Sequence, residues 1–84
     1  MRSHRVPRYY FHLRNDVNAR DEEGTELPNL AAALQKAVAE ACYMTAASVL
    51  EHGRINLHHA IEVADETGQV LERVEFGDVV KVER

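Results

Sequence analysis

Five histidines are the residues of this chain best suited to chemistry, because imidazole is both a common metal ligand and a base near neutral pH. Their spacing does not favour a metal site. His58 and His59 are adjacent, so on a strand they point to opposite faces, and no His-x-x-x-His helix motif is present. His12 and His59 could approach each other across a sheet, but no third ligand is identifiable. We therefore expect no metal site and no cofactor.

The densest group of carboxylates lies between positions 21 and 26 and consists of Asp21, Glu22, Glu23 and Glu26. Their spacing lacks the ligand order and the closing glutamate of a calcium-binding loop. A surface turn also lacks the apolar pocket that raises a carboxyl pKa for acid catalysis. We expect an acidic turn that keeps an edge strand from pairing with other chains.

The candidate nucleophiles lack the setting that catalysis requires. Cys42 is the only cysteine and falls in the middle of a predicted helix, where a small buried apolar residue is expected. Ser48 falls on the helix side expected to face the core, and Ser3 lies in the N-terminal arm. The four glycines are scattered, so no phosphate-binding loop is formed. The sequence predicts no catalytic residues and a protein that is not an enzyme.

Positive charge is concentrated at the N-terminus, although the whole chain has a net charge of −4. Residues 1–20 carry five arginines against one aspartate, and the remainder is acidic. Such an arm could contact nucleic acid through Arg2, Arg5 and Arg8, or could pair with the acidic surface of its own domain. Tyr10, outward on the first strand, would be a small stacking platform for bases.

Hydrophobic periodicity indicates the elements that position these residues. From Pro7 to Arg14 the residues alternate between two faces, which predicts a half-buried strand with Pro7 permitted as its first residue. The positions expected to face the core are Tyr9, Phe11 and Leu13. The acidic segment 20–27 could return beside this strand as a short edge strand, bent at Gly24.

A long helix is predicted over residues 30–52, with Asn29 as its N-cap and Gly53 as its stop. At 1.5 Å per residue it would be about 35 Å long, so part of it should extend beyond a sheet of six- to eight-residue strands. The stripe expected to face the sheet comprises Leu30, Leu34, Ala37, Val38, Ala41, Thr45, Ser48 and Val49.

The far side of this helix, called here the outer helix face, carries Ala32, Ala39, Tyr43, Ala46 and Leu50. Together with Lys36 these residues alternate at spacings of four and three, which is the spacing of a helix–helix contact with alanines permitting close approach. The alternative is that alanine is a good helix former and that Tyr43 and Leu50 are isolated exposed residues. If the contact is real, a second copy related by a two-fold axis is the expected partner.

After the helix, residues 59–64 and 69–76 predict two strands joined by a hairpin turn. Leu71 is out of phase, which indicates either a bulge or a strand with apolar surroundings on both faces. In the second strand Val70, Val74 and Phe76 are expected on one face. The expected fold is α+β: a two-layer sandwich in which an antiparallel sheet of three or four strands carries one long helix on one face, in the order β-β-α-β-β.

The domain limits follow from this pattern. Residues 1–6 form a flexible basic arm, residues 7–77 a single α+β domain, and residues 78–84 a tail or a short extra strand. No apolar run approaches the ~18 residues that span a bilayer, and no signal-peptide pattern opens the chain. We expect a cytoplasmic protein without membrane contact.

The chain resembles a family of small uncharacterised alphaproteobacterial proteins, common in rhizobia, which share an aromatic strand, an Asp-x-Glu-Gly-Thr-Glu-Leu-Pro segment, an alanine-rich helix and a hairpin. The matching segments here are residues 7–14, 21–28 and 61–68. A looser similarity is to the HicB-type antitoxin domain, from which the chain departs in its hairpin after the helix and in lacking an appended DNA-binding segment. Neither resemblance implies an enzymatic activity.

These observations predict a non-enzymatic protein-interaction module that forms a homodimer and binds another protein, through the outer helix face or an exposed sheet edge. The alternative is a nucleic-acid-binding or antitoxin-like regulatory protein that uses the basic arm.

Overall fold

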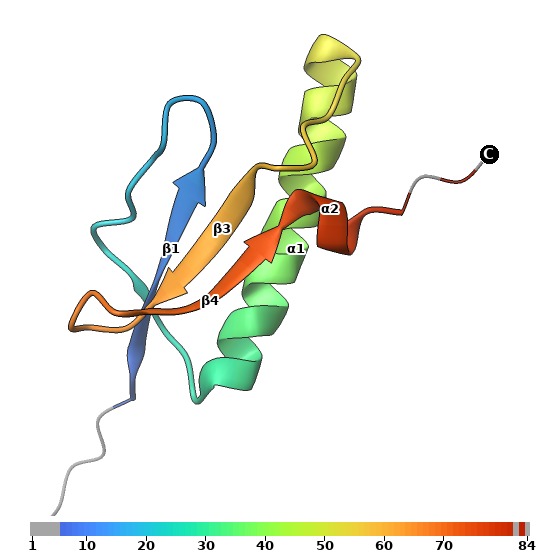
Figure 1. Ribbon diagram of the computed structural model, residues 1–84. Coiled ribbons are helices and arrows are strands. Elements are labelled where there is room, and N and C mark those ends of the chain that lie inside the picture. The colour runs from blue at the N-terminus through green and yellow to red at the C-terminus, as the bar shows by residue number, and fades with distance from the viewer. Residues whose placement is uncertain (1–5, 82, 84) are drawn as a thin grey trace, which may run out of the picture.

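The computed structural model describes residues 6–81 and residue 83. The elements are β1 (Arg8–Arg14), β2 (Thr25–Glu26), α1 (Leu30–His52), β3 (Ala60–Ala64), β4 (Val70–Glu75) and α2 (Phe76–Val79). The strands form one antiparallel sheet in the spatial order β2-β1-β3-β4, and α1 lies across one face of it (Figure 1). The predicted α+β architecture of a sheet and one long helix is confirmed.

The two central strands, β1 and β3, direct their apolar side chains toward α1. Phe11 lies opposite Val63 and Leu13 lies opposite Ile61, and directly paired residues point to the same face. Tyr9, Phe11, Ile61 and Val63 are buried there. The other face of the sheet, which no helix covers, carries Tyr10, His12, Arg14, Ala60, Glu62 and Ala64. The alternation expected for both strands is confirmed.

The outer edge of β1 is completed partly by backbone and partly by a side chain. Ala19 forms a bridge to Leu13 through two backbone hydrogen bonds of 2.8 and 2.9 Å. Farther along, the Asp21 carboxylate accepts from the Phe11 N–H at 3.1 Å, and only then does the two-residue β2 begin. The expected short edge strand within residues 20–27 is present, and a carboxylate replaces a strand carbonyl beside it.

The helix α1 begins and ends at the predicted residues. The Asn29 side chain accepts from the Ala32 N–H at 2.9 Å, which satisfies one free donor of the first turn. Gly53 adopts a left-handed conformation with φ of 69° and donates its N–H to the Val49 carbonyl. The C-terminal turns of α1 extend past the ends of the strands, as its length predicts (Figure 1).

The side of α1 that faces the sheet is centred on alanines, with Leu30 and Leu34 packed partly against the core, and it is turned away from Val38 and Val49. Its buried residues are Ala33, Ala37, Ala41 and Thr45. Val38 and Val49 are exposed, so their predicted core positions are wrong. One residue turns a helix by about 100°, which carries Val38 well away from Ala37. The small alanine side chains let α1 lie close to the sheet.

The hairpin between β3 and β4 has the expected turn, with Gly68 at φ of 90°. The register shifts beside Val63 and Ala64, which confirms a bulge at Leu71. Leu71 packs partly against the core, whereas Val70 is exposed. The prediction that Val70 shares the core face with Val74 and Phe76 is therefore wrong, because the bulge changes the alternation at this point.

Residues 76–79 form a single helical turn, α2, in which Phe76 is buried and the Gly77 N–H donates to the Leu57 carbonyl at 2.9 Å. Asp78 and Val79 thus belong to a helical turn, and the described residues after it, Val80, Lys81 and Glu83, are in no strand. The rest of the predicted tail or extra strand extends to Val82 and Arg84, which lie outside the described residues, as do residues 1–5 of the arm.

Among the described residues, no helix combines the length and the apolar character needed to cross a membrane.

Candidate functional site

The outer helix face is an uncharged surface directed away from the sheet. Ala39, Tyr43, Ala46 and Leu50 are exposed and Ala32 is half-buried. At about 100° per residue, these five positions lie opposite the buried alanines of α1. The structure therefore brings together on one surface the residues that the sequence predicted for a helix–helix contact.

Large apolar side chains occur on both sides of α1. Alanines fill the centre of the core side, where Leu30, Leu34 and Met44 also pack partly against the core, while Tyr43 and Leu50 on the outer helix face are 76% and 86% exposed. A helix with a single buried side normally carries its large apolar residues on that side and charged residues on the other. The helix α1 has the composition of a helix that is covered on both sides.

Charge is almost absent from this surface. Between Leu30 and Leu50 the sequence contains only Lys36 and Glu40 as charged residues, and they form an ion pair with each other. The Lys36 Nζ atom lies 5.3 Å from the centre of the Phe11 ring, so this side chain reaches toward the sheet. Lys36 therefore leaves the outer helix face free of charge.

Cys42 extends the same surface. Its thiol is exposed, so the prediction of a small buried residue is wrong. At 100° per residue, Cys42 lies on the flank of the outer helix face rather than over the sheet. The core side of α1 at this level is already occupied by Ala41 and Thr45.

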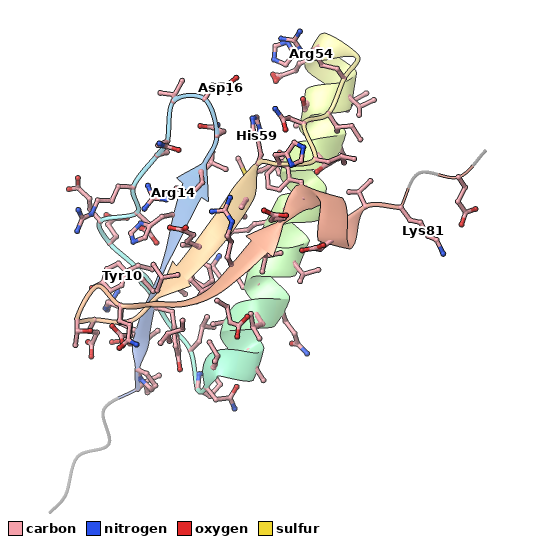
Figure 2. All side chains as sticks on the ribbon, viewed as in Figure 1. Tyr10, Arg14, Asp16, Arg54, His59 and Lys81 are labelled. Atoms are coloured by element: carbon pink, nitrogen blue, oxygen red, sulfur yellow. The ribbon has the colours of Figure 1, made fainter. Side chains whose placement is uncertain are left out.

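A second feature, a groove of about 820 Å³, lies where α1 extends past the sheet. Its walls come from the loop after β1, the last turns of α1 and the segment that leads to β3. Figure 2 shows His59 between the loop carrying Asp16 and the end of α1 near Arg54. The sequence analysis did not identify this groove, because its walls are far apart in the chain.

His59 is one of the polar residues that line the groove. Its ring packs edge-on against Phe76, with the ring centres 5.9 Å apart. Its Nε2 atom is the one buried side-chain polar atom in the described residues without a hydrogen-bond partner, and Asp16 Oδ1 lies 3.8 Å from it. That separation exceeds hydrogen-bond distance, so the two groups interact through charge only when His59 is protonated.

The histidines do not converge on a metal site. His12 is buried on the uncovered face of the sheet, where its Nδ1 accepts from the Asp21 N–H at 3.0 Å. His59 lies by the groove on the other side, so the approach of His12 and His59 across the sheet does not occur. No group of three potential ligands is found within the part of the chain that the structure describes.

The uncovered face of the sheet is crossed by an ion-pair network. Glu62 on β3 accepts from Arg14 Nε at 2.8 Å and from an Arg73 terminal nitrogen at 3.0 Å, so it ties β1 and β4 together. The hydrogen bond from Arg14 is the main reason that the pKa of Glu62 lies below its ordinary value; partial burial opposes this shift. The two arginines are thereby engaged within the protein.

Arg8, the described residue of the predicted nucleic-acid contact, is engaged as well. Its guanidinium donates to the Glu23 carbonyl at 2.8 Å and to the Glu26 carboxylate at 3.2 Å. A phosphate would have to share the guanidinium with these two partners. Arg2 and Arg5 lie outside the described residues, and the outward Tyr10 ring is stacked against His12.

Comparison with known proteins identifies a family without a known activity. No curated protein and no solved structure matches the chain. A family model described as a domain of unknown function, DUF6894, matches residues 8–77, which cover all four strands and α1.

Proposed function

The chain belongs to the DUF6894 family, and we propose that it is a non-enzymatic module that self-associates through the outer helix face. The observation that carries this proposal is the position of Tyr43 and Leu50, large apolar side chains that lie exposed on an uncharged side of α1. Removal of such a surface from water is favourable by about 25 cal/mol per Å². A second copy has the same surface, so a single contact about a two-fold axis covers the outer helix faces of both copies.

The size of the domain supports this proposal. The buried core combines three aromatic side chains, Tyr9, Phe11 and Phe76, with smaller residues that include five alanines, so it is modest in size. Small domains with modest cores often gain stability from oligomerisation. A dimer formed through α1 would have the layers sheet, helix, helix, sheet, and both sides of each helix would be buried.

The test is a pair of matched substitutions. Leu50 on the outer helix face and Val17 on the loop after β1 are both 86% exposed. Leu50→Glu places a carboxylate in the proposed contact, whereas Val17→Glu makes a similar change away from it. We expect Leu50→Glu to raise the dissociation constant of the dimer at least tenfold, which corresponds to about 1.4 kcal/mol. Sedimentation equilibrium measures this constant for each variant.

Val17→Glu should leave the dissociation constant unchanged. Tyr43→Glu and Ala46→Glu, on the same face as Leu50, should weaken the dimer as Leu50→Glu does. A monomeric wild-type protein, or a mass unaffected by all three substitutions on the outer helix face, would reject the proposal.

The alternative function, nucleic-acid binding or an antitoxin-like regulatory role through the basic arm, stays a prediction. No observation in the described residues favours it, since Arg8 is engaged with Glu23 and Glu26.

A further inference from the structure

The order of side-chain sizes along the outer helix face indicates how a second copy would dock. The positions follow one another as Ala32, Lys36, Ala39, Tyr43, Ala46 and Leu50, so small and large residues alternate strictly. Spacings of four and three residues keep all six near one line along α1. This inference rests on the self-association proposed above and adds the orientation and the alignment of the two copies.

A parallel pair of helices would bring identical positions together. Tyr43 would then meet Tyr43 of the second copy, while alanine would meet alanine, which leaves crowding at one level and gaps at the next. An antiparallel pair brings each small residue opposite a large one. The large residues of each copy therefore face small residues of the other only when the two helices run antiparallel.

We propose that two copies of α1 pack antiparallel and are related by a two-fold axis. The axis lies between the two helices, perpendicular to them, at the level of Ala41. This alignment places Ala32 opposite Leu50 and Ala39 opposite Tyr43, while Ala46 lies opposite position 36, whose side chain is directed toward the sheet. It is the antiparallel alignment in which the two copies of α1 overlap over their whole length. A shift of one heptad in either direction leaves Leu50 or Ala32 opposite no residue of α1.

Charge and length are compatible with this arrangement. Lys36 is already paired with Glu40 within its own helix, so the second copy meets no unpaired charge along the contact. The two helices overlap over residues 30–52, a length of about 35 Å. The alanines at every second position permit an interaxial distance near the lower end of the usual 8–10 Å, about 8 Å.

The proposed alignment brings the two Cys42 residues close together. Cys42 is one residue from Ala41, so the two copies of its Cα atom are offset by only about 3 Å along the helix axes. A two-fold axis perpendicular to the helices also keeps both thiols on the same side of the contact. In a parallel pair, the two thiols would lie on opposite sides of it.

Cross-linking through the native thiol tests the alignment. Cys42 is the only cysteine and is exposed, so mild copper-catalysed oxidation or a short bis-maleimide reports on it without an engineered label. The protein is treated at a concentration at which sedimentation shows a dimer, and the linked fraction is followed by denaturing electrophoresis without reductant. We expect rapid formation of a covalent dimer, which Cys42→Ser abolishes.

The matched control moves the thiol by two turns along the same side of α1. In the double variant Cys42→Ser/Gln35→Cys, the thiol is again exposed, but its two copies are about 18 Å apart along the axes of the proposed pair. This variant should link at least several-fold more slowly than the native protein. In a parallel pair, residue 35 and residue 42 would occupy equivalent positions and would link at similar rates.

The outcomes separate the two proposals. A dimer that links through Cys42 but not through position 35 supports the antiparallel alignment. A dimer that links equally at both positions, or at neither, overturns the alignment and leaves self-association standing. A protein that remains monomeric at all concentrations overturns both.

Discussion

Asp21 holds the loop that follows the edge of β1 through its side-chain carboxylate. Its carboxylate accepts hydrogen bonds from the backbone N–H groups of Phe11, Glu23 and Gly24, at 3.1 to 3.2 Å. Burial alone raises the pKa of Asp21, but these hydrogen bonds and the nearby His12 outweigh it and hold the pKa below the ordinary 3.8. The ionised form therefore stabilises the loop along the edge of β1.

The isosteric change Asp21→Asn should lower the free energy of unfolding by about 1–3 kcal/mol, because at least one N–H loses its acceptor. Glu22→Gln, at the exposed neighbouring position, should change it by less than about 0.5 kcal/mol. Chemical denaturation at pH 7 measures both. Equal stability of the wild type and Asp21→Asn would show that the carboxylate is not needed.

The same group predicts acid sensitivity. Since the folded pKa of Asp21 is depressed, its contribution is present above the unfolded value near 3.8 and is lost as the pH falls through the lower folded value. Stability measured from pH 6 down to pH 2 should therefore decline, and Asp21→Asn should decline less steeply. Glu62, also depressed by its arginine partners, accounts for part of the remaining slope.

At the scale of elements, Gly24 determines how closely the acidic segment follows β1. It has φ of 72°, and a Cβ atom there would lie 2.8 Å from Arg8 Cγ and 2.9 Å from Tyr10 Cε2. Gly68, in the hairpin turn, has φ of 90° but open space around it. Both glycines have a left-handed backbone conformation, but only at Gly24 would an added Cβ atom collide with neighbouring side chains.

This difference gives a comparison of two substitutions. Gly68→Ala should cost about 1–2 kcal/mol, the penalty for a left-handed alanine. Gly24→Ala should cost more, because Arg8 and Tyr10 must also move, and the ion pair of Arg8 with Glu26 should weaken. Thermal unfolding measures the loss of stability of both variants. A smaller loss for Gly24→Ala than for Gly68→Ala would contradict the close contact at this edge.

At the scale of the whole molecule, stability should depend on protein concentration. Self-association couples to folding by mass action, because the second copy binds only the folded α1. We expect the midpoint of thermal unfolding to rise as the wild-type concentration increases. The same rise in the midpoint of Leu50→Glu should require at least tenfold higher protein concentrations, and the midpoint of Val17→Glu should follow the wild type.

Local signals in the sequence determined most of the fold. Each of these signals depends on residues within a few positions of one another, so it can be predicted without the tertiary structure. They are the alternating side chains of β1 and β3, the N-cap at Asn29 and the helix end at Gly53. The outer helix face could be predicted for the same reason, since helical periodicity alone places Tyr43 and Leu50 on one side of the helix.

Only the tertiary structure decided which surfaces meet. It showed that the alanines of α1 are buried against the sheet and that Val38 and Val49 are exposed, since the side of a helix that is buried depends on how the helix is rotated against the sheet. It placed Cys42 in solvent and formed the groove of His59 from segments that are distant in sequence. It also placed the Asp21 carboxylate where it accepts a hydrogen bond from the Phe11 N–H, as a carbonyl of a neighbouring strand would. Periodicity specifies the faces of an element, but burial depends on the distance to a neighbouring element, which no local pattern contains.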